Sequence, residues 1–190
     1  MNTAVAPPSS LPLEARAAKI RLLALDVDGV LTDGSLHFDR NGDAGKSFSV
    51  RDGFGLRLLS EVGIQLAIIT GRSSGSVRAR ASELGITRVL EGVSDKAVAL
   101  RELAHVCGVD LDAVAYLGDD WPDLTALQIA GLAAAPADAE PDVRAHCHWV
   151  SSCRGGHGAV REFAETLLEW RGQRRALLAR YRDGHGRSAG

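Results

Sequence analysis

The stretch LLALDVDGVLTDG, residues 22–34, starts as an apolar run and ends with two aspartates, Asp26 and Asp28, followed by glycine. Similar short apolar runs recur as IQLAIIT (64–70), AVAYLGD (113–119) and GLAAA (131–135), and segments of helical periodicity separate them. Because these runs are apolar throughout, both faces of the strands should be buried under helices. The pattern predicts an α/β fold with a doubly wound parallel sheet.

Length and composition favour a single domain. The chain has 190 residues, of which 45% are hydrophobic, enough for one sizeable core. We expect a flexible N-terminal segment over residues 1–19, the main domain over 20–170 and a basic C-terminal tail over 171–190.

Charge and cysteine content indicate which partners and which cellular compartment to expect. The 22 basic and 24 acidic residues give a net charge of -2, which argues against a nucleic-acid partner. The sequence contains no run of 18 or more apolar residues, so we expect no membrane span. Its N-terminal residues lack the basic and apolar regions of a secretory signal. Three cysteines without a CxxC pair fit a reducing compartment, so we expect a cytoplasmic protein.

Polar residues follow the predicted strands at the edge where doubly wound sheets bind ligands. They are Asp26, Asp28, Thr70, Arg72, Asp119, Asp120 and Asp123, and Lys96 begins a helix between two of the strands. Carboxylates beside a hydroxyl and an ammonium group are typical of a magnesium and phosphate site. Each element alone has a structural alternative, because DVDG suits a turn and GDDWPD suits a helix N-cap followed by proline.

Together, LDVDGVLTDG, IITGR, Lys96 and GDDWPD resemble the four motifs of the haloacid dehalogenase superfamily, and the resemblance covers residues 20–165. It implies a Rossmann-like sheet and covalent phosphate chemistry. By this resemblance Asp26 is the nucleophile that forms an aspartyl-phosphate, and Asp28 is the general acid and then the general base. A carboxylate nucleophile splits the hydrolysis into two easier steps, and proton transfer by a positioned carboxyl contributes typically 10²- to 10⁴-fold.

The resemblance also implies the Mg²⁺ and phosphate ligands. Thr70 and Lys96 would bind the phosphoryl oxygens. The metal group would consist of Asp26, Asp28 through its backbone carbonyl, Asp119 as a direct ligand, and Asp120 and Asp123 as residues that orient metal-bound water.

The gaps between the motifs are too short for an inserted cap domain, so the protein resembles the capless members. SLHFD and GKSFSV flank Asn41-Gly42, which predicts a protruding β-hairpin at about residues 35–50. Its apolar Leu36, Phe38 and Phe48 need a partner, and capless members resemble homotetramers in which neighbouring subunits close the site. The alternative is a flap folded onto its own domain.

FSVRDGFGLRLL (48–59) and CRGGHGAVRE (153–162) narrow the resemblance to phosphatases of an eight-carbon sugar acid 8-phosphate, which act in lipopolysaccharide synthesis. The substrate would then be surrounded by Arg51, Arg57, Arg72, Arg80 and Lys96, together with the backbone and small side chains of Ser49, Val50, Asp52 and Gly53. Arginine forks suit a substrate that carries both a carboxylate and a phosphate. The GGxG segment would reach a neighbouring subunit's site, and His157 stands where the family commonly has arginine.

Three alternatives remain open at this stage. The nearest is a phosphatase for a nine-carbon sugar acid 9-phosphate, and the more distant one is a phospho-acceptor signalling domain of the receiver type. The third is a zinc site built from His146, Cys147, His148, Cys153 and His157.

Overall fold

The protein is described by a computed structural model that covers residues 11–40 and 42–184. Its main sheet has six parallel strands in the order β5-β4-β1-β6-β7-β8. These strands are β1 (Leu22–Leu25), β4 (Gln65–Ile69), β5 (Arg88–Leu90), β6 (Val114–Leu117), β7 (Leu132–Ala135) and β8 (Trp149–Val150). β2 (His37–Asp39) and β3 (Gly42–Gly45) form a separate antiparallel pair.

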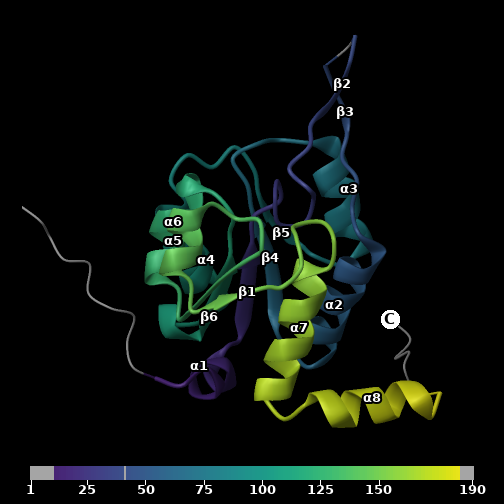
Figure 1. Cartoon of the computed structure of the whole chain (residues 1–190), viewed down its shortest axis with the longest axis vertical. Coiled ribbons are helices and arrows are strands. Elements are labelled where there is room, and N and C mark those ends of the chain that lie inside the picture. Colours follow the sequence, from purple (N-terminus) through teal and green to yellow (C-terminus); the bar gives the residue numbers. More distant parts are fainter. Residues whose placement is uncertain (1–10, 41, 185–190) are drawn as a thin grey trace, which may run out of the picture.

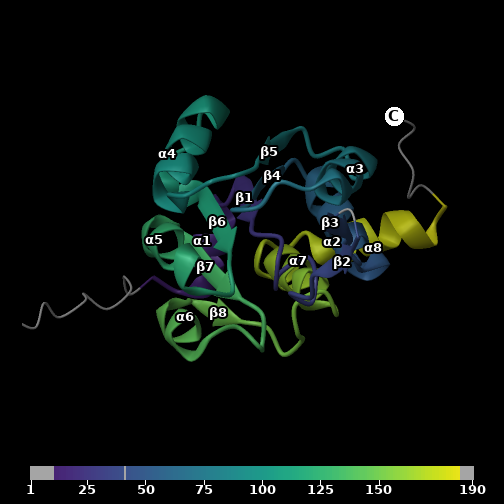
Figure 2. The same ribbon diagram turned by 90° about the horizontal axis from the view of Figure 1, so that it is seen from above.

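Helices cover both faces of the main sheet. They are α1 (Leu13–Lys19), α2 (Val50–Glu61), α3 (Gly75–Glu83), α4 (Lys96–Cys107), α5 (Leu124–Ile129), α6 (Pro141–His146), α7 (Ala159–Trp170) and α8 (Arg174–Arg182), with short 3-10 turns at η1 (Leu111–Ala113) and η2 (Trp121–Asp123). Viewed from above, α4, α5 and α6 lie on one side of the sheet, and α2, α3 and α7 lie on the other (Figure 2).

Two apolar cores result, one on each face. Leu23 and Leu25 of β1 belong to the core under α2 and α7, whereas Leu22 and Ala24 belong to the core under α4 and α5. All four side chains are fully buried. This accounts for the unbroken apolar runs and confirms the predicted doubly wound α/β fold.

The hairpin differs in detail from the prediction. β2 and β3 extend away from the body of the domain (Figure 1), but the second strand is Gly42–Gly45, so GKSFSV mostly follows it. Phe38 is 66% exposed, whereas Phe48 is partly buried against the core of the domain. Asn41, the first residue of the expected turn, lies outside the described residues.

Both ends of the domain continue into helices. Residues 13–19, expected within a flexible segment, form α1, where Ala17 is fully buried and the Arg16 guanidinium donates to the Gly131 carbonyl at 2.6 Å. In the basic tail, α8 buries Leu177, and the ring of Tyr181 lies edge-on to that of Phe54 in α2, with their centroids 5.5 Å apart. Residues 1–10 and 185–190 of the two expected segments lie outside the described residues.

Among residues 11–40 and 42–184, no helix has the length and apolar character that crossing a membrane requires.

Candidate active site

The site is centred on the carboxyl end of β1, where the strand order reverses direction. From β1 the chain adds β4 and β5 on one side, and then crosses over to β6, β7 and β8 on the other. Asp26 follows β1 directly, and its backbone amide donates to the carbonyl of Leu117, the last residue of β6, at 2.9 Å. A crevice outside the carboxyl ends of strands at such a switch point is where doubly wound folds bind ligands.

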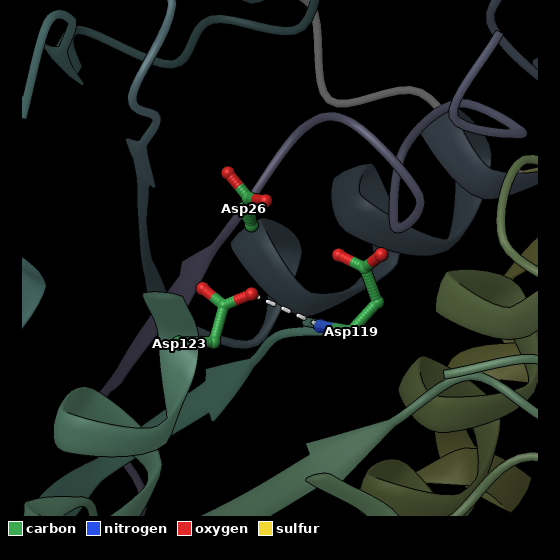
Figure 3. Close-up of side chains that lie close together, drawn as sticks. All are labelled: Asp26, Asp119 and Asp123. Atoms are coloured by element: carbon green, nitrogen blue, oxygen red, sulfur yellow. Dashed lines mark hydrogen bonds between the residues drawn. The ribbon is translucent and has the colours of Figure 1, made fainter. Parts of the chain in front are cut away.

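Three carboxylates gather at this point. Asp26, Asp119 and Asp123 each offer an oxygen, and these atoms lie within 4.8 Å of one another (Figure 3). Asp123 is the most firmly held, because one of its oxygens accepts from the amides of Asp119 at 3.1 Å and Asp120 at 3.3 Å. Its other oxygen accepts from the hydroxyl of Tyr116 at 2.7 Å.

Burial and mutual repulsion make this group unfavourable when it is fully ionised. Burial, together with the charge of Asp123, raises the pKa of Asp26 to about 6, although Lys96 opposes the shift. Burial and the charges of Asp123 and Asp26 raise the pKa of Asp119 to about 8. Oδ1 of Asp119 is buried without a hydrogen-bond partner in the described part of the chain. Hard oxygen ligands with unmet charge and an orphaned oxygen fit a divalent cation such as Mg²⁺.

Lys96 supplies positive charge to the group. The side chain of Asp95 caps the N-terminus of α4 by accepting from the amides of Ala97 and Val98, and Lys96 is the first residue of this helix. Its buried ammonium group lies 2.7 Å from Asp123 Oδ1 and 3.0 Å from Asp26 Oδ1. Burial lowers the pKa of Lys96, but the charges of Asp26 and Asp123 raise it by more than burial lowers it. The net shift is upward, so the ammonium group stays protonated.

Thr70 lies at the same edge of the sheet, one strand away. It follows β4, and its amide donates to the carbonyl of Leu90 in β5 at 2.9 Å. Its buried hydroxyl oxygen accepts from the amide of Arg72 at 3.3 Å. The second motif is therefore fixed by the strand pairing of the sheet.

Asp28 has a different environment from Asp26. One of its oxygens forms an ion pair with the ammonium group of Lys46, and the other lies 3.9 Å from Nε of Arg72. Its side chain is 21% exposed, against 10% for that of Asp26. The sequence did not suggest Lys46 as a site residue.

The glycines around Asp26 and Asp28 allow segments to approach closely. Gly29 has φ +87°, and a Cβ at this position would lie 2.0 Å from Oδ2 of Asp119. A Cβ at Gly155 would lie 1.7 Å from the carbonyl oxygen of Gly29, and the amide of Gly156 donates to the Val30 carbonyl at 3.0 Å. The GGxG segment thus packs against the catalytic loop of its own chain.

Two expected site residues have contacts that stabilise helix ends. The exposed Asp120 accepts from the amide of Trp121 at 2.7 Å as the N-cap of η2, and it lies outside the carboxylate group. Asp52 is 1% exposed and accepts from the amides of Gly158 at 3.1 Å and Arg161 at 2.7 Å, which caps α7. Its carboxylate therefore links the start of α7 to α2.

The remaining expected substrate residues lie at the start of α2 and on α3. Ser49 is the N-cap of α2, Val50 is 81% exposed, Arg51 is exposed and Gly53 is buried. Arg80 of α3 is mostly buried, and it donates to the Ser49 carbonyl and to Glu83, each at 2.8 Å. A Cβ at Gly53 would lie 2.1 Å from this guanidinium group. The exposed Arg57 donates to the Glu83 carbonyl at 3.3 Å. These contacts link α2 to α3.

The histidines and cysteines of the zinc alternative do not gather. In the described ranges, the potential metal ligands that come together are the three aspartates named above. Nδ1 of His148 accepts from the amide of Ala133 at 2.9 Å, and burial raises the pKa of the Cys147 thiol to about 12.

Comparison with known proteins agrees with this geometry. A family model described as haloacid dehalogenase-like hydrolase matches residues 82–163. The 3-deoxy-D-manno-octulosonate 8-phosphate phosphatase of Yersinia pestis is 45% identical over 153 residues, which cover 80% of this chain and 82% of the relative.

Solved structures agree as well. The phosphatase of the same name from Moraxella catarrhalis, in complex with a magnesium ion, a phosphate ion and a KDO molecule, matches with a TM-score of 0.86 and 42% identity, over 88% of this chain and 97% of the other. The cobalt-bound form of the Haemophilus influenzae phosphatase matches with a TM-score of 0.82 and 42% identity, over 84% and 93% of the two chains.

The fold and the carboxylate site together define a haloacid dehalogenase-like hydrolase. Within that class, the chain belongs to the family of 3-deoxy-D-manno-octulosonate 8-phosphate phosphatases.

Proposed function

We propose that the protein is a Mg²⁺-dependent phosphatase that hydrolyses 3-deoxy-D-manno-octulosonate 8-phosphate to the free sugar acid and phosphate, a step of lipopolysaccharide precursor synthesis. The observation that carries the proposal is the position of Asp26, whose carboxylate lies 3.0 Å from the ammonium group of Lys96 and beside the carboxylates of Asp119 and Asp123. A nucleophilic carboxylate, a cationic side chain and a divalent-metal site are what phosphoryl transfer to an aspartate requires.

The reaction proceeds in two steps on this chain's residues. The ionised carboxylate of Asp26 attacks phosphorus, and the leaving sugar oxygen takes a proton from Asp28. Water then attacks the aspartyl-phosphate, gives a proton to the Asp28 carboxylate and releases phosphate from Asp26. Lys96 and the Thr70 hydroxyl bind the phosphoryl oxygens, where charge must be stabilised in a site with little water.

Asp26 and Asp119 would hold the metal directly, with the Asp28 backbone carbonyl as a further ligand. Asp123, whose oxygens already accept hydrogen bonds within the protein, would orient metal-bound water. When bound, Mg²⁺ neutralises the charge of the carboxylates and of the transferring phosphoryl group. Asp26, whose pKa is raised to about 6 by burial without metal, is then ionised and ready to attack at neutral pH.

Arg72 is the best placed of the expected substrate arginines. It follows the second motif, its side chain is 59% exposed, and Nε lies 3.9 Å from the Asp28 carboxylate. An exposed guanidinium group beside the acid that protonates the leaving oxygen can pair with the substrate's carboxylate. Arg57, Arg80 and the start of α2 shape the neighbouring surface.

We propose a capless site completed by assembly. The hairpin exposes Phe38, and Val50 at the start of α2 is also exposed, so apolar side chains remain to be covered. A homotetramer with shared active sites would cover them, and the reaction would take place in the cytoplasm. Light scattering at nanomolar protein concentration tests the assembly, because a fully active monomer would contradict it.

A panel of phosphate esters tests the function. Phosphate release is measured with Mg²⁺ on octulosonate 8-phosphate, a nonulosonate 9-phosphate and p-nitrophenyl phosphate, and EDTA is the control for metal dependence. We expect the highest kcat/KM on the eight-carbon acid and no turnover in EDTA. A preference for the nine-carbon acid would show that the proposed substrate is wrong. Turnover that survives complete metal removal would refute the mechanism.

A further inference from the structure

Lys46 lies in the site but belongs to none of the four motifs. Its side chain is 1% exposed, and its ammonium group pairs with Oδ1 of Asp28. A lysine is almost never buried to this extent unless its charge is paired. The pair therefore determines where this side chain lies, and it holds the Asp28 carboxylate in turn.

The origin of Lys46 connects the hairpin to the chemistry. β3 ends at Gly45, which has φ +140°, and Lys46 is the next residue before the chain enters α2. The hairpin extends outward from the body (Figure 1), while the residue at its base turns inward to the catalytic loop. The position of the ammonium group thus depends on how the hairpin leaves the domain.

The second oxygen of Asp28 is oriented by this arrangement. With Oδ1 paired to Lys46, Oδ2 is the oxygen that lies near the exposed Arg72, on the side expected to face the substrate. Rotation of a carboxylate about its terminal torsion is otherwise broadly permitted. Proton transfer needs the donor oxygen within hydrogen-bond reach of the leaving oxygen, so fixing one oxygen aims the other.

We propose that Lys46 is a positioning residue, which holds the Asp28 carboxylate in the orientation required for proton transfer to the leaving oxygen. The proposal rests on the phosphatase function above. The proton passes from Asp28 to the sugar oxygen in the first step and from water to Asp28 in the second, so Lys46 gives and receives none.

The test compares leaving groups that differ in their need for a proton. Octulosonate 8-phosphate and glucose 6-phosphate release an alkoxide that must be protonated, and the latter has no carboxylate. p-Nitrophenyl phosphate releases a stable phenolate that needs no acid. kcat/KM is the suitable measure, because it reports the steps up to the departure of the leaving group.

Lys46→Met removes the charge and keeps the length of the side chain. We expect kcat/KM to fall about ten- to hundredfold on both sugar phosphates, a loss that corresponds to part of the general-acid contribution. On p-nitrophenyl phosphate we expect kcat/KM to change less than threefold. Lys46→Arg should recover most of the loss. Lys19→Met is the matched control, because Lys19 is half exposed and pairs with Asp112 at 2.8 Å, and its kinetics should match the wild type.

Other outcomes overturn the proposal in recognisable ways. Equal losses on all three esters would mean a general structural role, and a loss confined to the octulosonate ester would mean direct contact with the substrate carboxylate. No loss would remove Lys46 from the reaction. If Lys46→Met does not fold by circular dichroism, Lys46→Gln replaces it with the same expected difference. A wild type inactive on octulosonate 8-phosphate refutes the proposed substrate, whereas glucose 6-phosphate and p-nitrophenyl phosphate still test Lys46.

Discussion

The cluster formed by Asp26, Asp119 and Asp123 should lower the stability of the metal-free protein. Asp119→Asn should therefore stabilise the metal-free protein. Burial and the charges of Asp123 and Asp26 raise the pKa of Asp119 to about 8 in the folded chain, against 3.8 as the ordinary value. At pH 7 the unfolded chain ionises this carboxyl while the folded metal-free chain keeps it protonated. At about 1.4 kcal/mol for each pH unit above the unfolded pKa, the cost at pH 7 is at most about 4 kcal/mol.

The sign of the pH dependence follows from the raised pKa. The stabilising contribution of the protonated group is fully present below pH 4 and is lost as the pH rises to about 8. In EDTA, the free energy of unfolding of Asp119→Asn should exceed that of the wild type by an amount that grows over this window. Because the neighbouring carboxylates share the repulsion, we expect a final difference of about 2–4 kcal/mol.

Urea unfolding in EDTA at pH 4.5, 6 and 8 measures this difference. Asp112→Asn is the control, since this exposed carboxylate pairs with Lys19 at the surface and its removal should cost less than about 1 kcal/mol at each pH. Added Mg²⁺ should raise the stability of the wild type by binding the folded state and should raise that of Asp119→Asn much less. A difference that stays constant with pH would refute the reasoning.

Four further predictions concern single residues. Asp26→Asn should abolish phosphate release while leaving the circular dichroism spectrum unchanged, and wild-type-like activity would remove Asp26 as the nucleophile. Arg72→Ala should lower kcat/KM ten- to hundredfold on octulosonate 8-phosphate and far less on p-nitrophenyl phosphate, since a charge-assisted contact is worth roughly 1.5–3 kcal/mol. Arg80→Ala, which removes hydrogen bonds to Glu83 and to the Ser49 carbonyl, should instead lower the urea midpoint, and a pure change in KM would contradict this. Gly155→Ala should cost about 1–3 kcal/mol of stability because its Cβ would overlap the catalytic loop, whereas Gly75→Ala, with nothing closer than 4.0 Å, should not.

The sequence predicted the sheet well because burial on both faces leaves a simple pattern. Each apolar run became a strand, and the parallel arrangement brought the strand ends to one edge. The second hairpin strand was misplaced because its sequence, GDAG, has no residue that favours strands, so only its pairing with β2 makes it one. α1 was missed because seven residues near the N-terminus carry little helical signal without the domain they pack against.

The site was predictable only as far as it depends on chain order. Asp26, Lys96, Asp119 and Asp123 come together because their strands are neighbours. Tyr116 was missed because it lies inside an apolar strand and reads as core, although burial keeps its hydroxyl protonated to donate to Asp123. The sequence did offer one indication, because a tyrosine in a buried strand two positions before a motif needs a hydrogen-bond partner for its hydroxyl.

The sequence could not predict which arginine side chains remain accessible to a substrate. Their chemistry suits a sugar acid phosphate, but a guanidinium group already bonded within the protein has fewer donors left for a substrate. Arg80 is 13% exposed in its side chain and bonded to α2, whereas Arg72 is 59% exposed. Sequence gives the residue type at each position, and only the packing of α2 against α3 tells which guanidinium group remains accessible.

The two aspartates of the first motif are separated by one residue, yet their surroundings assign them different work. Asp26 is 7% exposed and lies against Lys96 and two carboxylates, a place for a group that must meet phosphorus beside a metal. Asp28 is more exposed and lies between Lys46 and Arg72, toward the leaving group. Adjacent carboxyls take distinct roles when their environments differ. Since Lys46 comes from the hairpin base, the division of roles in this motif depends on a segment outside the four motifs, which is why exchanging Lys46 should alter acid catalysis while leaving the attack by Asp26 in place.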